Sequence, residues 1–492
     1  MKKSVSRNYI YNLVYQVFSI ITPFITTPYV SRVLGSDGVG QYSFTYSIAT
    51  YFVLLGSLGF GYYAQREIAS KQGFANEQSK IFWEILICRL LMVLLSSSVY
   101  VLLIFLNVYD ESYSNLMWIL LINVLATAFD IVFLFQGNEE FGTILFRNIA
   151  IKCVGIALIF IFVKQRSDIG IYVFCQSITL LLANLSLWLK VPKKLVRVHL
   201  NDLNFKRHFL PSLKLFIPTL AISVYTMLDK TLIGVLIPGV NEAGVRIADI
   251  ENGNYEQSEK IVKMALTLLT SIGIVMLPRN SQNVASGNYV LFKANIHKVL
   301  RFVFLLGLPL MFGISAIAFN FSPWFFGNGF DKVPFLMMMF SPIIVIIGIS
   351  NVFGLQYLIP LKKDKHFTIS IVAGAAVNLL LNLVLIPFFG SYGACFATII
   401  GELCVTFCMA FFARKDVSVI KELLLCWKYV ISAILMFAAV FVTQLYLPSS
   451  ILNTIILVFE GIIIYICLIL LLRDEFFLTI LKSIERKIKK EG

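Results

Sequence analysis

Six charged residues lie close together between two long apolar segments near the middle of the chain. They are Asp229, Lys230, Glu256, Glu259, Lys260 and Lys263. The apolar runs on either side of residues 225–263 are each long enough to cross a bilayer. A charge at the centre of a helix in lipid costs about 2.5–3.5 kcal/mol. These side chains therefore need partners, a water-filled cavity or a charged ligand.

Local pairing is the alternative for the second half of this stretch. Glu256 and Lys260, and likewise Glu259 and Lys263, are four residues apart with the acid first, the favourable order on a helix. Asp229 and Lys230 are adjacent, so they do not share a helix face. The sequence leaves open whether the second set is a site or a pair of local ion pairs.

The composition indicates an all-α integral membrane protein. Of the 492 residues, 58% are hydrophobic and only 14% are charged, whereas a soluble chain has about 25% charged residues. The net charge of +14 would suggest a nucleic-acid partner in a soluble protein. Here the basic residues fall in loops between apolar runs, where they set topology, so we expect membrane lipids and no nucleic acid as partners.

The apolar runs predict fourteen transmembrane helices. Their expected residues are 9–33, 40–63, 81–107, 115–137, 144–163, 168–189, 209–237, 255–279, 297–321, 334–360, 366–388, 391–413, 424–446 and 451–472. Loops on one side then hold 29 lysines and arginines, against five on the other. The positive-inside rule places the richer side, with both termini, in the cytoplasm of a multi-pass membrane protein.

A basic segment, residues 190–207, divides the chain. It predicts an N-terminal lobe of six helices (1–189), a second lobe of six (208–414), two further helices (415–472) and a basic tail (473–492). Six helices return the chain to the same side, which predicts a parallel repeat. The spacing from Tyr42 to Arg66 equals that from Tyr255 to Arg279, 24 residues in both. The second lobe carries an additional expected outer loop, 238–252.

The chain lacks the motifs of catalytic and metal sites. All eight cysteines lie in apolar runs without a CxxC motif, so neither a disulfide nor a metal is expected. The four histidines fall in basic loops or at helix starts, where we expect solvated side chains. They are His199, His208, His297 and His366. No enzyme activity, catalytic residue or cofactor is predicted.

Charges inside the expected spans concentrate in the first twelve, which favours a cavity between the two lobes. They are Arg89, Asp130, Lys152, Lys214, Asp229, Lys230, Glu256, Glu259, Lys260, Lys263, Glu402, Lys428 and Glu460, with Arg32 at the end of the first span. Eight are cations and six are anions, and this small excess suits an anionic substrate.

Four segments carry a resemblance that extends over essentially the whole chain. They are Pro28–Phe44, Leu228–Gly234, Tyr255–Lys263 and Val275–Arg279. With them the chain resembles the bacterial flippases for O-antigen and capsule repeat units, in the multidrug/oligosaccharidyl-lipid/polysaccharide superfamily. The resemblance implies fourteen helices in two lobes around a central cavity.

The resemblance also implies a function. The cargo would be an undecaprenyl-diphosphate-linked oligosaccharide, moved to the outer face by alternating access coupled to H⁺ or Na⁺. Polysaccharide polymerase and chain-length proteins are implied as partners. Candidate diphosphate contacts are Arg32, Lys152, Lys214, Lys230 and Lys260, and candidate ion-coupling residues are Asp130, Asp229 and Glu256.

Two other classes stay open. A drug or cation antiporter of the same superfamily would have a net acidic cavity, which the excess of membrane cations does not favour. A membrane glycan polymerase would carry a large outer loop rich in arginine and histidine. The expected outer loops hold five basic residues and no histidine.

Overall fold

The computed structural model describes residues 5–191, 195–196, 198–199, 202–417 and 419–482. Within them the regular structure is helical apart from one isolated bridge between Val240 and Arg246. Eleven helical stretches are long and apolar enough to cross a membrane. This confirms a multi-pass, all-helical protein. Residues 192–194, 197 and 200–201 of the basic segment 190–207, and residues 483–492 of the basic tail, lie outside the described residues.

Two of the eleven stretches are 50 residues long, about twice what a bilayer requires. One, Ile21–Ser70, includes residues 21–57 of α1 (Val5–Ser57), in which Gly35 is non-helical at φ 73°. The other is α13 (Asp364–Ala413), in which Gly390 is non-helical at φ 57°. Only glycine adopts a positive φ readily, so the chain can change direction at Gly35 and at Gly390, and each stretch forms two spans. With α8 (Lys206–Leu236), a helix of 31 residues, the total is the predicted fourteen.

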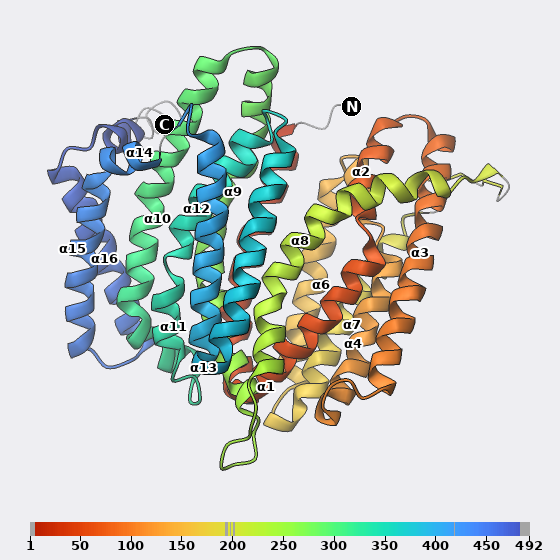
Figure 1. The fold of residues 1–492 in the computed structure, drawn as a ribbon, viewed down its shortest axis with the longest axis horizontal. Helices are drawn as coiled ribbons and strands as arrows, with labels where there is room; N and C mark the ends of the chain where they lie inside the picture. The colour runs from red at the N-terminus through yellow and green to blue at the C-terminus, as the bar shows by residue number, and fades with distance from the viewer. Residues whose placement is uncertain (1–4, 192–194, 197, 200–201, 418, 483–492) are drawn as a thin grey trace. The chain divides into compact units, whose positions relative to one another are not determined.

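The described helices fall into two compact units, Met1–Gly253 and Asn254–Gly492 (Figure 1). The first unit holds α1, α2 (Phe60–Ser70), α3 (Ala75–Phe105), α4 (Ser114–Ala126), α5 (Val132–Gly137), α6 (Phe141–Phe162), α7 (Ile169–Trp188), α8 and the start of α9 (Ile247–Ala285). The second holds the rest of α9, α10 (Tyr289–Phe326), α11 (Val333–Phe340), α12 (Ile343–Asn351), a π-helix (Val352–Leu358), α13, α14 (Val419–Leu425), α15 (Trp427–Tyr446) and α16 (Ile451–Leu471).

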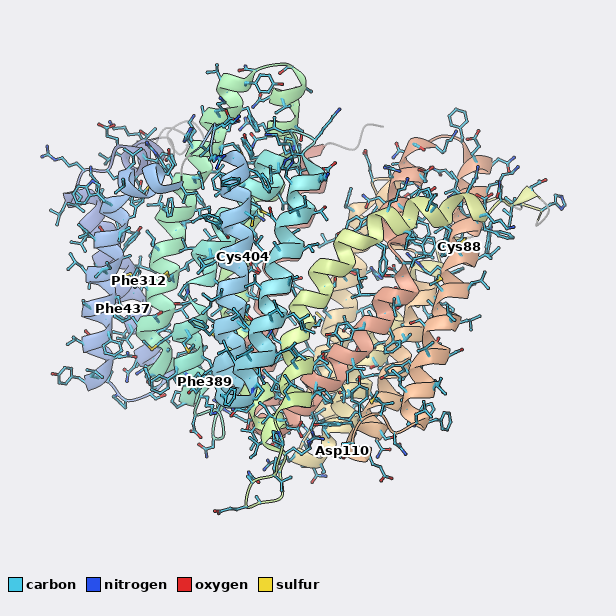
Figure 2. The ribbon with its side chains drawn as sticks, viewed as in Figure 1. Cys88, Asp110, Phe312, Phe389, Cys404 and Phe437 are labelled. Carbon is cyan, nitrogen blue, oxygen red and sulfur yellow. The ribbon has the colours of Figure 1, made fainter. Side chains whose placement is uncertain are left out.

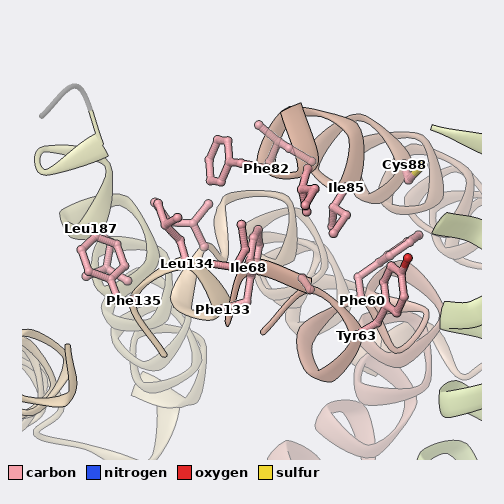
Figure 3. Packing of buried hydrophobic residues seen from close by; sticks show 14 of the residues in the cluster. Phe60, Tyr63, Ile68, Phe82, Ile85, Cys88, Phe133, Leu134, Phe135 and Leu187 are labelled. Carbon is pink, nitrogen blue, oxygen red and sulfur yellow. The ribbon is translucent and has the colours of Figure 1, made fainter. Parts of the chain in front are cut away.

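In the first unit α1 packs against α3, α4, α6 and α8, and α4 packs against α7. An apolar core joins α2, α3 and α5, as Figure 3 shows for Phe60, Ile68, Phe82 and Phe133. These four side chains are at most 2% exposed. The short helices α2 and α5 are therefore anchored on α3, and they hold the adjoining polar residues in fixed positions.

In the second unit α10 is the central helix, packed against α11, α12, α15 and α16. Its Phe312 faces Phe437 of α15 with ring centroids 5.9 Å apart (Figure 2). α13 packs against α11, α12 and the π-helix. The predicted division into lobes at residues 190–207 stays a prediction. The two compact units are defined by which helices pack together, and this does not test a division based on the order of the spans along the chain.

The predicted spans 115–137 and 334–360 are each present but consist of shorter helices, α4 and α5 in the first and α11, α12 and the π-helix in the second. One expectation about an individual element was wrong. The outer loop expected over 238–252 ends earlier, because α9 begins at Ile247. Asp249 and Glu251 therefore lie in a helix, 1% and 6% exposed, instead of in a solvated loop. Their burial follows from the close packing of this first turn of α9 against α1.

Candidate functional site

The end of α8 carries the two adjacent charges of the central stretch inside the first unit. Asp229 and Lys230 are 2% and 8% exposed. Beside them, Thr231 Oγ1 lies 2.8 Å from Ser47 Oγ and 3.0 Å from Tyr51 Oη, both on α1. The two charges are thus buried next to a row of hydroxyl groups, which supplies the polar environment that the sequence requires.

The start of α9 adds to this polar region. The Asn252 side chain donates a hydrogen bond of 2.8 Å to the Lys230 carbonyl, and Asn252 is fully buried. Near the same turn, Tyr113 donates a bond of 2.5 Å to Asp249, and the Arg246 guanidinium lies 5.0 Å from the centre of the Tyr113 ring. Within the first unit, Tyr113 in the 3-10 turn before α4, the end of α8 and the start of α9 thereby form a buried polar network.

Arg246 also reaches the loop before α4. Its Nη1 lies 3.1 Å from Asp110 Oδ2, and the Asp110 carboxylate accepts a bond from the Ser112 backbone N–H at 3.0 Å. The Ser112 N–H, and with it the Arg246 charge, lowers the pKa of Asp110 below its ordinary value. This ion pair ties residues 110–113 to the turn that precedes α9.

The second charged set of the central stretch forms local pairs in the second unit. Lys260 Nζ lies 3.6 Å from Glu256, and Lys263 Nζ lies 2.6 Å from Glu259. Both pairs span one helical turn, as the spacing allows. The local alternative left open by the sequence is therefore realised. Lys260 and Glu256 stay candidates for diphosphate and ion contact, although neither charge is isolated.

The remaining candidate cations lie on three helices of the first unit. Arg32 is exposed on the first half of α1, and Lys214 is exposed on α8. Lys152 on α6 is partly buried and donates a bond of 2.9 Å to Ser19 Oγ on α1. The structure brings Lys152 and α1 into contact and keeps Lys214 at the surface of its unit.

Asp130, a candidate for ion coupling, has a partner that sequence reasoning did not assign. Arg89 on α3 lies with Nη1 3.8 Å from Asp130 Oδ2 and donates from Nη1 to the Asp130 carbonyl. The two residues are 41 positions apart. The sequence did offer a signal for this pair: Arg89 is the only cation in the third span and Asp130 the only anion in the fourth, and charges inside the membrane tend to pair with one another.

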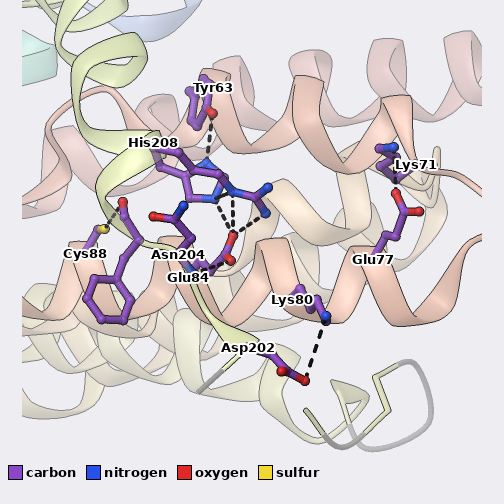
Figure 4. A network of polar contacts seen from close by, with 11 residues as sticks. Tyr63, Lys71, Glu77, Lys80, Glu84, Cys88, Asp202, Asn204 and His208 are labelled. Carbon is purple, nitrogen blue, oxygen red and sulfur yellow. Dashed lines mark hydrogen bonds and ion pairs between the residues drawn. The ribbon is translucent and has the colours of Figure 1, made fainter. Parts of the chain in front are cut away.

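A second buried network joins α2, α3 and the start of α8 (Figure 4). The Glu84 carboxylate, 1% exposed, accepts bonds from Arg207 Nη2 at 2.6 Å and lies 2.6 Å from His208 Nε2. His208 Nδ1 lies 2.8 Å from Tyr63 Oη. The expectation of a solvated histidine was thus wrong for His208, which is 1% exposed. His208 is buried by residues far from it in the sequence, Tyr63 and Glu84, and the local sequence around His208 does not indicate these contacts.

An apolar cavity of about 440 Å³ lies between α10, α15 and α16 in the second unit. Leucine, isoleucine, valine and methionine side chains line nearly all of it, together with Gly313, Gly461 and Tyr465. The two glycines leave room because they lack side chains. Met436 is the nearest neighbour of Gly313 and a close neighbour of Gly461. The cavity is suited to a flexible hydrocarbon chain.

Relatives support this architecture over nearly the whole chain. A protein of Escherichia coli (strain K12) named "Putative O-antigen transporter" is 27% identical over 431 residues, which are 86% of this chain and 99% of that protein. The solved structure of the lipid II flippase MurJ in an inward closed conformation aligns with a TM-score of 0.66 at 17% identity, covering 92% of this chain and 99% of that one.

An inward-facing multidrug transporter of the MATE family, in the MOP superfamily, aligns with a TM-score of 0.62 at 13% identity. It covers 83% of this chain and 97% of that one. Likeness at this level of identity shows a shared fold. The profile of the family described as "Polysaccharide biosynthesis protein" matches residues 5–284, more than half of the chain. The chain therefore belongs to the polysaccharide biosynthesis protein family and has the fold of the MurJ and MATE transporters.

Proposed function

We propose that this protein is a flippase that moves polyprenyl-diphosphate-linked oligosaccharide units from the inner to the outer face of the bacterial cytoplasmic membrane. The observation that carries the proposal is the similarity to a relative named for O-antigen transport, which covers 99% of that relative and 86% of this chain. A chain made of transmembrane helices also suits transport better than catalysis. The protein acts by alternating access and is not an enzyme.

Cationic side chains supply contacts for the diphosphate. Lys230 is the foremost candidate, since a buried ammonium beside hydroxyl groups can hold a phosphate oxygen strongly. Arg32, Lys152, Lys214 and Lys260 are the other candidates. Asp130, Asp229 and Glu256 are candidates for the coupling ion, H⁺ or Na⁺.

The apolar cavity of the second unit receives part of the polyprenyl chain. Its volume of about 440 Å³ and its almost wholly apolar lining match an isoprenoid segment rather than a sugar. Contact with lipid hydrocarbon is favourable there, because the lining has few polar groups that would stay unbonded.

The topology follows from charge. Both termini lie in the cytoplasm, residues 1–189 and 208–414 form the two lobes, and residues 415–472 add two helices before the basic tail 473–492. The partners are the lipid-linked cargo and membrane lipids, with the polymerase and chain-length proteins that use the flipped unit.

The test is deletion of the gene, followed by lipid extraction and mass spectrometry of polyprenyl-diphosphate species. Accumulation of complete repeat units that face the cytoplasm is expected. Units that reach the outer face but stay unpolymerised would indicate a polymerase. Altered drug tolerance with unchanged lipid-linked sugars would indicate an antiporter.

Complementation then tests Lys230. The Lys230→Ala variant should fail to clear the accumulated lipid-linked units while it stays at normal abundance in the membrane. Lys190→Ala is the control, because Lys190 is exposed and lies beyond the end of α7. Wild-type export by Lys230→Ala would remove Lys230 from the diphosphate contacts.

A further inference from the structure

The first unit contains a groove of about 570 Å³ between α3, α7 and the segment that follows α7. Trp83 of α3 and Trp188 of α7 form two of its walls. Aliphatic side chains between residues 191 and 198, together with His199, complete the lining. The groove shares no lining residue with the apolar cavity of the second unit, and the proposed function does not use it.

Aromatic packing fixes both tryptophan rings. Phe82, which is fully buried, meets Trp83 edge to face with ring centroids 5.3 Å apart, and it meets Trp188 in the same way at 6.1 Å. Trp188 also donates from Nε1 to the Phe129 carbonyl at 2.9 Å. Because a buried ring and a hydrogen bond hold the two tryptophans, the walls of the groove are preformed.

The segment after α7 is fastened to the same surface. The Val196 N–H donates to Ser79 Oγ of α3 at 3.0 Å, and Ser79 is fully buried. Val191 belongs to the apolar core of α2, α3 and α5, and Leu195 packs against this core. The tryptophans therefore border an enclosed space, whereas an aromatic belt at a membrane surface requires only single rings at the interface.

The groove continues into a surface that suits hydrocarbon. Trp83 lies near the start of the predicted span 81–107, on the side expected to be cytoplasmic, so α3 runs from the groove into the bilayer. Leu90 and Leu94 stand on the same face of α3 as Trp83 and are 38% and 60% exposed. At the end of α7, Leu189 is 82% exposed. An acyl chain can therefore lie against Trp83 and extend along α3.

The rim of the groove is cationic. Lys80 lies one helical turn before Trp83 on α3, and Lys190 follows Trp188 by two residues. Asp202 Oδ2 lies 3.9 Å from Lys80 Nζ, beyond hydrogen-bond distance, and the Asp202 side chain is 53% exposed (Figure 4). The sequence of residues 190–207 holds six lysines and arginines against one acid. The charge of this rim is complementary to an anionic headgroup.

We propose that the groove binds one anionic phospholipid, with its phosphate beside Lys80 and Lys190 and an acyl chain against Trp83. Basic pockets at the cytoplasmic ends of membrane helices suit such headgroups. The lining offers one polar side chain, His199, whereas an oligosaccharide head requires several convergent polar groups. A phospholipid with a small head therefore fits better than the lipid-linked cargo. The bound lipid holds Leu195 and Val196 against α3.

Fluorescence quenching by brominated lipids tests the site in the full-length protein. Phosphatidylcholine vesicles receive the same mole fraction of either phosphatidylglycerol or phosphatidylcholine with brominated acyl chains, and the Trp83 signal is the fluorescence that Trp83→Phe loses. Quenching of Trp83 should give a binding constant about tenfold higher for phosphatidylglycerol, because lysines near the surface favour an anionic lipid.

Two controls separate the groove from general attraction to basic loops. Trp427 is 48% exposed beside Lys428 at the start of α15 and does not line the groove, so the signal lost in Trp427→Phe should be quenched nearly equally by the two lipids. The double variant Lys80→Gln/Lys190→Gln should lose the preference at Trp83. Lys71→Gln/Lys206→Gln removes the same charge outside the groove and should keep the preference.

Equal quenching of Trp83 by the two lipids in the wild type would overturn the site. A preference that survives the loss of Lys80 and Lys190 would overturn it as well. Relief of the quenching by a small mole fraction of polyprenyl diphosphate would assign the groove to the cargo lipid and overturn the phospholipid assignment. These readouts measure lipid contact alone, so failure of the flippase proposal would leave them unchanged.

Discussion

Gly40 and Gly253 lie opposite each other where α1 meets the first turns of α9, and each faces the carbonyl four residues before the other. A Cβ at Gly40 would lie 1.7 Å from the Asp249 oxygen, and one at Gly253 would lie 1.9 Å from the Ser36 oxygen. The reciprocal contact has the form of a pseudo-twofold relation. Both glycines stand two residues before the tyrosines that open the 24-residue spacing of the predicted repeat.

Alanine at either glycine should destabilise the protein by about 1–3 kcal/mol, because a methyl group cannot fit between the two backbones without moving them. Thermal unfolding of Gly40→Ala and Gly253→Ala in detergent measures the effect. Gly61→Ala on α2 is the control, since nothing lies within 4 Å of a Cβ there. Equal melting temperatures for the three variants would contradict the close approach of α1 and α9.

The Glu84 network should be a strong contributor to stability. Replacing Glu84 by Gln removes the charge that Arg207 and His208 share, at a cost of about 3 kcal/mol, because His208 stays buried beside a weaker acceptor. The matched control is Glu77→Gln, since the Lys71–Glu77 pair of 2.6 Å is half exposed and should contribute less than about 1 kcal/mol (Figure 4). Similar melting temperatures for the two variants would exclude a structural role for the buried network.

The Asp416 carboxylate should give the second unit a stability that depends on pH. Lys293 Nζ, 2.7 Å away, and then the Tyr357 hydroxyl lower the pKa of Asp416 below its ordinary value of 3.8. Because the pKa of Asp416 is lower in the folded protein than in the unfolded chain, the ionised carboxylate adds its full stabilisation at any pH above the unfolded-state pKa. This stabilisation is lost as the pH falls through the folded-state pKa. Asp416→Asn should therefore lower the melting temperature at neutral pH, by an amount that shrinks below pH 3.8.

The comparison for this prediction is Asp364→Asn. Asp364 is an exposed carboxylate in the first turn of α13. At neutral pH the Asp364→Asn substitution should change the melting temperature by less than the Asp416→Asn substitution does. A difference between wild type and Asp416→Asn that stays constant down to about pH 2.5 would contradict the assignment of the ionised carboxylate.

Filling the apolar cavity should impair transport without unfolding the protein. Gly461→Leu projects an isobutyl group toward the space between α10, α15 and α16, where it competes with a polyprenyl chain. Gly461→Ala is the control, because its Cβ would meet Val440 and Met436 at 3.4 Å and 3.6 Å, which is ordinary contact. We expect lipid-linked units to accumulate about tenfold with leucine, the effect of losing about 1.4 kcal/mol of binding, and to stay at wild-type levels with alanine. Normal export by Gly461→Leu would exclude this cavity as a cargo contact.

The sequence alone determined the number of membrane spans and the helical class of the fold. Both follow from the length and spacing of apolar runs, which are local properties of the chain. The turns at Gly35 and Gly390 fall between expected spans for the same reason. The pairs Glu256–Lys260 and Glu259–Lys263 were also open to prediction, since one helical turn fixes which residues meet.

Only the tertiary structure decided which distant residues meet. The burial of His208 beside Glu84, the entry of Asp249 into a helix packed on α1, and the contact between Arg89 and Asp130 all join residues more than 30 positions apart. Neither periodicity nor hydropathy encodes such pairs, because each depends on how whole helices pack. The helices are specified locally, whereas the polar sites between them arise only when the helices come together.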